Sequence, residues 1–145
     1  MEIHDISLPI SESGFTVPGY QGVEISQPKH MDRGDRSTVS HFSMLAHQGT
    51  HVDAPAHFIP GGSGVDSLDL NVLVGPTLVL EITEADVISA HLLKRLGIPS
   101  GTERILFHTR NSELWEREER EFREDFVGLS ADGADWVLSH GIRLF

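Results

Sequence analysis

The stretch "LAHQGTHVDAPAHF", residues 45–58, brings four side chains that can bind a metal ion into eleven consecutive positions. They are His47, His51, Asp53 and His57. An even spread of the nine histidines over 145 residues would place fewer than one in such a window. The glycine and proline within the stretch disfavour a helix, although the first two histidines have helical spacing. In an extended segment, residues of equal parity share a face, so these side chains can converge.

Imidazole and carboxylate ligands suit Zn²⁺, Mn²⁺ or Fe²⁺. The chain contains no cysteine, which excludes thiolate ligands and disulfides. Three protein ligands with one open position are typical of a catalytic site, where bound water has a pKa of about 7. His47, His51 and Asp53 can form such a set. His57, which follows the proline, would then serve as a general acid or base beside the metal.

The other histidines are expected to be ordinary core or surface residues, because an isolated histidine has no partner ligand in its own segment. They are His4, His30, His41, His91, His108 and His140.

Composition narrows the class of protein. A chain of 145 residues predicts a single domain spanning residues 1–145. The formal net charge of −11 disfavours nucleic acid and anionic membranes as partners, because both require a basic surface. The N-terminus lacks the features of a signal peptide, and no run approaches the roughly 20 apolar residues of a membrane span. We therefore expect a cytoplasmic protein.

Predicted strands alternate with predicted helices, which indicates the α/β class. One helix is expected to begin at a capping box formed by Thr83 and Asp86. The pattern predicts strands over residues 2–10, 37–46, 72–82 and 103–109, and helices over residues 83–96, 112–125 and 130–140.

The last residues, "GIRLF", resemble the first half of an apolar strand with no following residues to cover it. A buried strand needs neighbours for its backbone groups. We therefore expect that the domain lacks its C-terminal third here or depends on another subunit.

The segment "HQGTHVDAPAHF" resembles the HxGTHxDxPxHF signature of the metal-dependent cyclase family, which includes bacterial kynurenine formamidases and isatin hydrolases. Weaker similarity extends over almost the whole chain. It includes the segments "DISLPI", "LVGPTLVLEI", "ITEADV", "ILFHTRNSELW" and "GIRLF".

The resemblance implies a swivelling β/β/α fold, homodimers or larger homo-oligomers, and hydrolysis of a small amide or cyclic amide. By position it makes His47, His51 and Asp53 the metal ligands and His57 the catalytic acid or base. Zinc is the first expectation for the ion and manganese the second. Family members continue for a further third, which supplies another histidine and a glutamate at or beside the metal.

Two functional hypotheses remain open at this stage. The first is a metal-dependent amidohydrolase of the arylformamidase kind, as used in tryptophan catabolism. The second is a metal-binding or assembly module without catalysis, because the later ligands are missing from the sequence. A closed structural zinc site is a minor third alternative.

Overall fold

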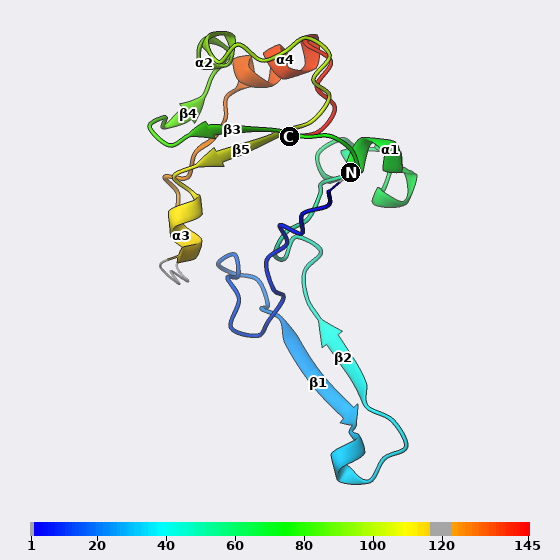
Figure 1. Ribbon diagram of the computed structural model, residues 1–145. Helices are drawn as coiled ribbons and strands as arrows, with labels where there is room; N and C mark the ends of the chain where they lie inside the picture. The colour runs from blue at the N-terminus through cyan, green and yellow to red at the C-terminus, as the bar shows by residue number, and fades with distance from the viewer. Residues whose placement is uncertain (1, 117–122) are drawn as a thin grey trace. The chain divides into compact units, whose positions relative to one another are not determined.

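The computed structural model describes residues 2–116 and 123–145. Figure 1 shows the helices and strands in chain order. They are β1 (Glu24–Lys29), η1 (Met31–Arg33), β2 (Val39–Ser43), η2 (Pro55–His57), η3 (Val65–Ser67), α1 (Leu70–Leu73), β3 (Leu78–Ile82), β4 (Val87–Ile88), α2 (Ala90–Arg95), β5 (Ile105–Thr109), α3 (Ser112–Glu116), β6 (Gly128–Leu129) and α4 (Ala131–Ser139).

The described residues fall into two compact units. Unit 1 comprises residues 2–65, and unit 2 comprises residues 66–116 and 123–145. The single domain expected from chain length stays a prediction.

Unit 1 contains an antiparallel hairpin in which β1 pairs with β2, with Ile25 opposite Phe42 (Figure 1). Every residue of both strands is exposed. The turn between the strands contains η1, whose N-cap His30 accepts a hydrogen bond from the Asp32 amide, and it closes at Gly34 with a φ of 88°. Strand β2 lies within the strand predicted over residues 37–46, which is confirmed.

The strand predicted over residues 2–10 is wrong, since this segment forms no ladder. Its amides bond to side chains instead: Ser7 donates to Asp5 and Leu8 donates to Thr50. Alternating apolar residues favour a strand locally, but a strand also needs a backbone partner.

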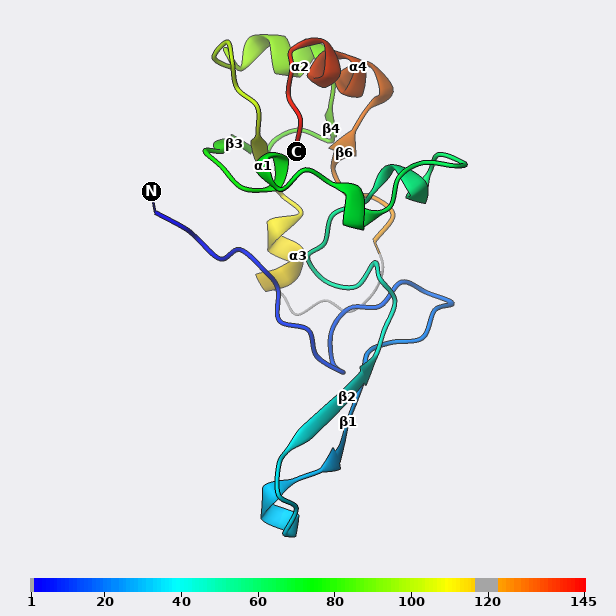
Figure 2. The same ribbon diagram turned by 90° about the vertical axis from the view of Figure 1, so that its right-hand side faces the viewer.

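Unit 2 contains two parallel strand pairs and the hydrophobic core. Strand β3 pairs with β5, and β4 pairs with β6. Helices α2 and α4 lie side by side (Figure 2). The core cluster consists of Ile82, Ile88, Leu93, Ile105, Val127, Trp136, Val137 and Ile142.

The helix predicted over residues 83–96 begins later than expected. Its N-cap is Ser89, whose hydroxyl accepts from the Leu92 amide at 3.3 Å, and the helix proper starts at Ala90. The expected cap partner Asp86 instead forms an ion pair with Arg110. Residues Val87–Ile88 belong to β4, because β6 offers them a backbone partner.

The strand predicted over residues 72–82 is confirmed only in its second half, where β3 begins at Leu78. Its first two residues belong to the short helix α1, whose N-cap Asp69 accepts from the Asn71 amide at 2.9 Å, and residues 74–77 are irregular. This hydrogen bond is the main reason why the pKa of Asp69 is lowered. Helix α1 then ends ahead of the Gly75-Pro76 pair, where a helix cannot readily continue.

Helix α4 lies within the helix predicted over residues 130–140 and is capped by Ser130, which accepts from the Gly133 amide. The Ser130 hydroxyl also bonds to Asp132, and this contact is the largest cause of the lowered pKa of Asp132. The helix predicted over residues 112–125 is seen as α3. Residues 117–122 of that prediction lie outside the described part, and residues 123–125 are not helical.

The final segment pairs in parallel with the start of β5. Arg104 and Leu144 form a bridge, and the Ile105 amide donates to the Leu144 carbonyl at 3.0 Å. The apolar residues expected to form a strand here thus have a backbone neighbour. Within residues 2–116 and 123–145, no helix combines the length and the apolar character that a membrane span requires.

Candidate metal centre

The first two candidate ligands follow β2, His47 within a turn and His51 directly after it. Residues 46–50 form turns and bends, and residues 51–54 continue without regular structure to η2. Gly49 has a φ of 65°, a left-handed conformation that glycine adopts without strain. This stretch is not helical, as the sequence predicts, although His47 and His51 have helical spacing.

Three predicted ligand atoms converge in this turn. His47 Nδ1 lies 3.2 Å from His51 Nε2 and 2.9 Å from Asp53 Oδ1. His51 Nε2 lies 3.5 Å from the same carboxylate oxygen. Ligand atoms bound at about 2.0–2.2 Å in a tetrahedral zinc site are separated by about 3.3–3.6 Å. The chain alone therefore holds one carboxylate and two imidazole atoms at separations that fit a small divalent cation.

The hydrogen bonding of His51 favours metal ligation. Its Nδ1 lies 2.9 Å from the Gly49 carbonyl oxygen, which can only accept. The Nδ1 atom therefore carries the proton, and the lone pair of Nε2 faces the other two ligand atoms. Fixing the tautomer in this way is a common second contact of metal-binding histidines.

The three side chains remain accessible to solvent. His47, His51 and Asp53 keep 40%, 32% and 41% of their side-chain surface exposed. A structural zinc site is usually closed by four protein ligands, whereas a catalytic site keeps a position open. Among the described residues, three candidate ligand atoms converge and stay open to solvent, which leaves space for a further ligand.

His57 lies beside the cluster. Its ring centroid is 4.0 Å from that of His47, and the two rings are tilted by 40°. On its other side the ring contacts Phe58, with centroids 4.1 Å apart. His57 thus contacts His47 without belonging to the group whose atoms converge.

Other histidines have structural contacts that fit the expectation of ordinary residues. The His30 ring caps η1 through its Nδ1 atom. The His140 ring stacks on Trp136 at a centroid distance of 3.8 Å, and its Nδ1 bonds to the Trp136 carbonyl.

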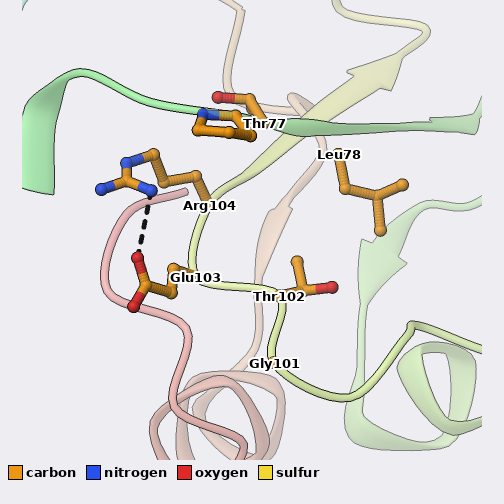
Figure 3. A pocket seen from close by; sticks show the side chains of 7 residues that line it. Thr77, Leu78, Gly101, Thr102, Glu103 and Arg104 are labelled. Carbon is orange, nitrogen blue, oxygen red and sulfur yellow. Dashed lines mark hydrogen bonds and ion pairs between the residues drawn. The ribbon is translucent and has the colours of Figure 1, made fainter.

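Unit 2 also has a cavity of about 390 Å³, lined by residues 76–78 and 101–104 (Figure 3). Its charged residue Arg104 is buried and paired with Glu103 at 3.2 Å. The Arg104 guanidinium also donates to the carbonyls of Asn71 and Val72 in α1. Since all these contacts are internal, we interpret Arg104 as a residue that fixes α1 to β5.

The segment from His47 to His51, the metal turn, also contains two residues with distant contacts that the sequence patterns did not identify, Gln48 and Thr50. The Gln48 side chain is buried and donates to the Phe15 carbonyl. The Thr50 hydroxyl accepts from the Leu8 amide at 3.0 Å. Both residues lie between two candidate ligands, which could have indicated a role in positioning them. Neither residue type binds zinc strongly, so neither is identified by looking for metal ligands.

A family model described as "Putative cyclase" matches residues 4–145 of the chain. The chain belongs to this cyclase family. Among its relatives is cyclase-like protein 3 of Arabidopsis thaliana, which is 36% identical over 149 residues that cover 96% of this chain and 54% of the relative. A kynurenine formamidase of Bacillus thuringiensis subsp. konkukian is 31% identical, with coverage of 97% and 65%.

A solved structure described as a potential metal-dependent hydrolase with cyclase activity superimposes on this cyclase-family chain with a TM-score of 0.78. The two are 28% identical, and the match covers 97% of this chain and 65% of the other. The chain therefore spans about half the length of the Arabidopsis relative and about two thirds of the solved one. The mixed α/β class expected from the sequence is confirmed, as is the family resemblance.

Proposed function

We propose that the chain is the metal-binding part of a hydrolase that cleaves a small amide or cyclic amide. His47, His51 and Asp53 hold a divalent ion, and His57 is the acid or base. The observation that carries the proposal is the convergence of His47 Nδ1, His51 Nε2 and Asp53 Oδ1 within 3.5 Å of one another. The names of the kynurenine formamidase and hydrolase relatives support the reaction type.

Zinc is the proposed ion and manganese the alternative, because two imidazoles and one carboxylate suit both. When bound, such an ion polarises a carbonyl group and acidifies water at neutral pH.

The residues of the chain have separate tasks in this scheme. Asp53 brings the negative charge that offsets the cation. Gly49 keeps the His51 ring in the tautomer that can bind, through its carbonyl oxygen. His57, in contact with the His47 ring, is placed to deliver a proton to the nitrogen that leaves when the amide bond breaks.

The proposal also covers three properties of the whole protein. They are the swivelling β/β/α fold, assembly into homodimers or larger homo-oligomers, and a cytoplasmic location. The resemblance within the "HQGTHVDAPAHF" segment and the structural match support the fold.

The deciding experiment replaces one ligand. His51→Ala should remove bound metal, measured by elemental analysis, and hydrolysis of a panel containing N-formylkynurenine, isatin and a cyclic imide. His41→Ala is the matched control, since His41 is an exposed residue of β2 in the same unit. A His51→Ala protein that keeps metal and turnover at the control's level would refute the proposal.

The same experiment addresses the second hypothesis. Because the chain spans about half the length of the Arabidopsis relative, metal binding without turnover remains a distinct outcome. Metal content lost in His51→Ala, with no substrate hydrolysed by the wild type, would favour a metal-binding module.

A further inference from the structure

We infer that residues 8–15 form a support for the metal turn, so that metal binding and the order of this segment are thermodynamically coupled. The inference rests on the proposed metal site and goes beyond it, since it assigns positioning roles to Gln48 and Thr50. All the contacts lie within unit 1.

The first contact is made by Gln48, which directly follows the ligand His47. Its residue exposure is 8%, and the described part of the chain buries only two other polar residues, Arg104 and Thr109. The Gln48 Nε2 donates to the Phe15 carbonyl. A buried amide group that loses its acceptor is costly, so this bond ties the turn to the segment.

The second contact is made by Thr50, which directly precedes the ligand His51. Its hydroxyl accepts from the Leu8 amide at 3.0 Å. Gly49, between the two, faces the same segment, because a Cβ atom at this position would lie 3.7 Å from Ile10 Cγ1.

All three residues that join His47 to His51 therefore face or bond to residues 8–15. The spacing of the two imidazoles depends on the backbone of these three residues. A metal site loses affinity when its ligands are not held in place beforehand, and outer contacts typically contribute about 10–100-fold. Coupling of this kind is reciprocal: if the segment favours metal binding, bound metal must favour the ordered segment.

The described hydrogen bonds within the segment are short-range. Residues 2–10 form no strand. Within residues 8–15, the Gly14 amide donates to the Ser11 carbonyl, and the Ser11 and Ser13 hydroxyls are hydrogen-bonded at 3.2 Å. Glu12 connects the segment to β1 by accepting from the Ile25 amide at 2.9 Å. Residues 8–15 thus link the hairpin to the metal turn.

The first test measures zinc affinity by competition with a chelating dye. Gln48→Leu should bind zinc about tenfold more weakly than the wild type. Gln27→Leu is the matched control, because it makes the same change at an exposed position of β1. A second pair of variants tests the coupling if Gln48→Leu does not fold. Thr50→Val should bind zinc more weakly than the wild type, whereas Thr50→Ser, which keeps the hydroxyl, should bind zinc as the wild type does.

The second test follows amide hydrogen exchange with and without zinc. Zinc should slow exchange of the Leu8 amide, whose acceptor is Thr50. The Met31 amide, which donates to the Thr38 hydroxyl at 3.2 Å, is a matched amide-to-hydroxyl bond in the same unit but outside the segment, and its exchange should slow less than that of Leu8.

The outcomes separate the two proposals. A wild type that binds no zinc or manganese overturns both. If the wild type binds zinc but Gln48→Leu and Thr50→Val stay within about twofold of it, well below the effect of an outer contact, only the coupling is overturned. Unchanged exchange at Leu8 on zinc binding would also overturn the coupling alone.

Discussion

At the scale of single residues, the sequence indicated which candidate ligands could converge, but it did not indicate the residues that support them. Imidazole and carboxylate groups are recognisable by type, and the structure brings His47, His51 and Asp53 together as expected. The roles of Gln48 and Thr50 depend on Phe15 and Leu8, which are distant in sequence. No local pattern reports such contacts.

The structure separates His57 from the ligand set, and this distinction can be tested. His57→Gln should retain metal, because the three converging atoms remain, while kcat falls by about 10²–10⁴-fold through loss of proton transfer. Metal analysis together with steady-state kinetics on the same amide panel measures both effects.

His41→Gln provides the control, since it makes the same change away from the cluster. Loss of metal in His57→Gln would instead make His57 a ligand. An unchanged kcat would remove it from the mechanism.

At the scale of elements, helix α4 approaches β4 at Gly133. A Cβ atom added there would lie 2.4 Å from the Ile88 carbonyl oxygen. Glycine to alanine in a helix normally stabilises by about 0.5–1 kcal/mol. At Gly133 we expect alanine to destabilise instead, because either the helix or the strand must move to relieve the contact.

We therefore expect Gly133→Ala to lower the free energy of unfolding by about 1–3 kcal/mol, the usual cost of overpacking. Urea denaturation, monitored by circular dichroism, measures this change in the free energy of unfolding. Asp135→Ala, at an exposed position of the same helix, should not destabilise. A stabilised Gly133→Ala would mean that α4 and β4 are not in close contact.

The elements predicted correctly are those with local signals. Ser130 caps α4, and the apolar run over residues 103–109 contains β5. The start of α2 was missed because Thr83 and Ser89 are both suitable N-caps. Only the pairing of Val87–Ile88 with Gly128–Leu129, far apart in sequence, decides between them.

At the scale of the whole molecule, hydrophobic burial is unequal between the two units. The eight residues of the core cluster all belong to unit 2. Among residues 2–65, the one buried hydrophobic residue is Val23. Unit 1 therefore gains little from apolar burial, and bound metal is expected to contribute a large share of its stability.

This difference in apolar burial predicts that zinc stabilises unit 1 more than unit 2. At a zinc concentration 100 times its Kd, binding stabilises the site by about 2.7 kcal/mol. Exchange of the Ala56 amide, which donates to the Ser63 carbonyl in unit 1, should slow. Exchange of the Leu93 amide in the core of unit 2 should change less.

Hydrogen exchange with zinc, and again after chelation, measures both amides in one sample. Equal slowing at Ala56 and Leu93 would show that metal stabilises the chain uniformly. No change at Ala56 would contradict a stabilising role in unit 1.

Class and family were predictable at this scale because both rest on patterns within the chain, the alternation of strands with helices and the "HQGTHVDAPAHF" segment. The division of burial between the units was not, because the sequence contains apolar residues throughout. Ile25 in β1 and Phe42 in β2 are large apolar residues that face each other across the hairpin, yet both remain exposed.

The exposed hairpin has a consequence for aggregation. Two strands with unpaired outer edges can template the addition of strands from other molecules, which leads toward fibrils. Strand β1 ends in Pro28 and Lys29, and its pairing with β2 is irregular between Ser26 and Lys29. Proline lacks an amide donor, lysine adds a charge, and an irregular ladder bends the strand edge. The exposed hairpin therefore presents no straight edge to which strands of other molecules can add.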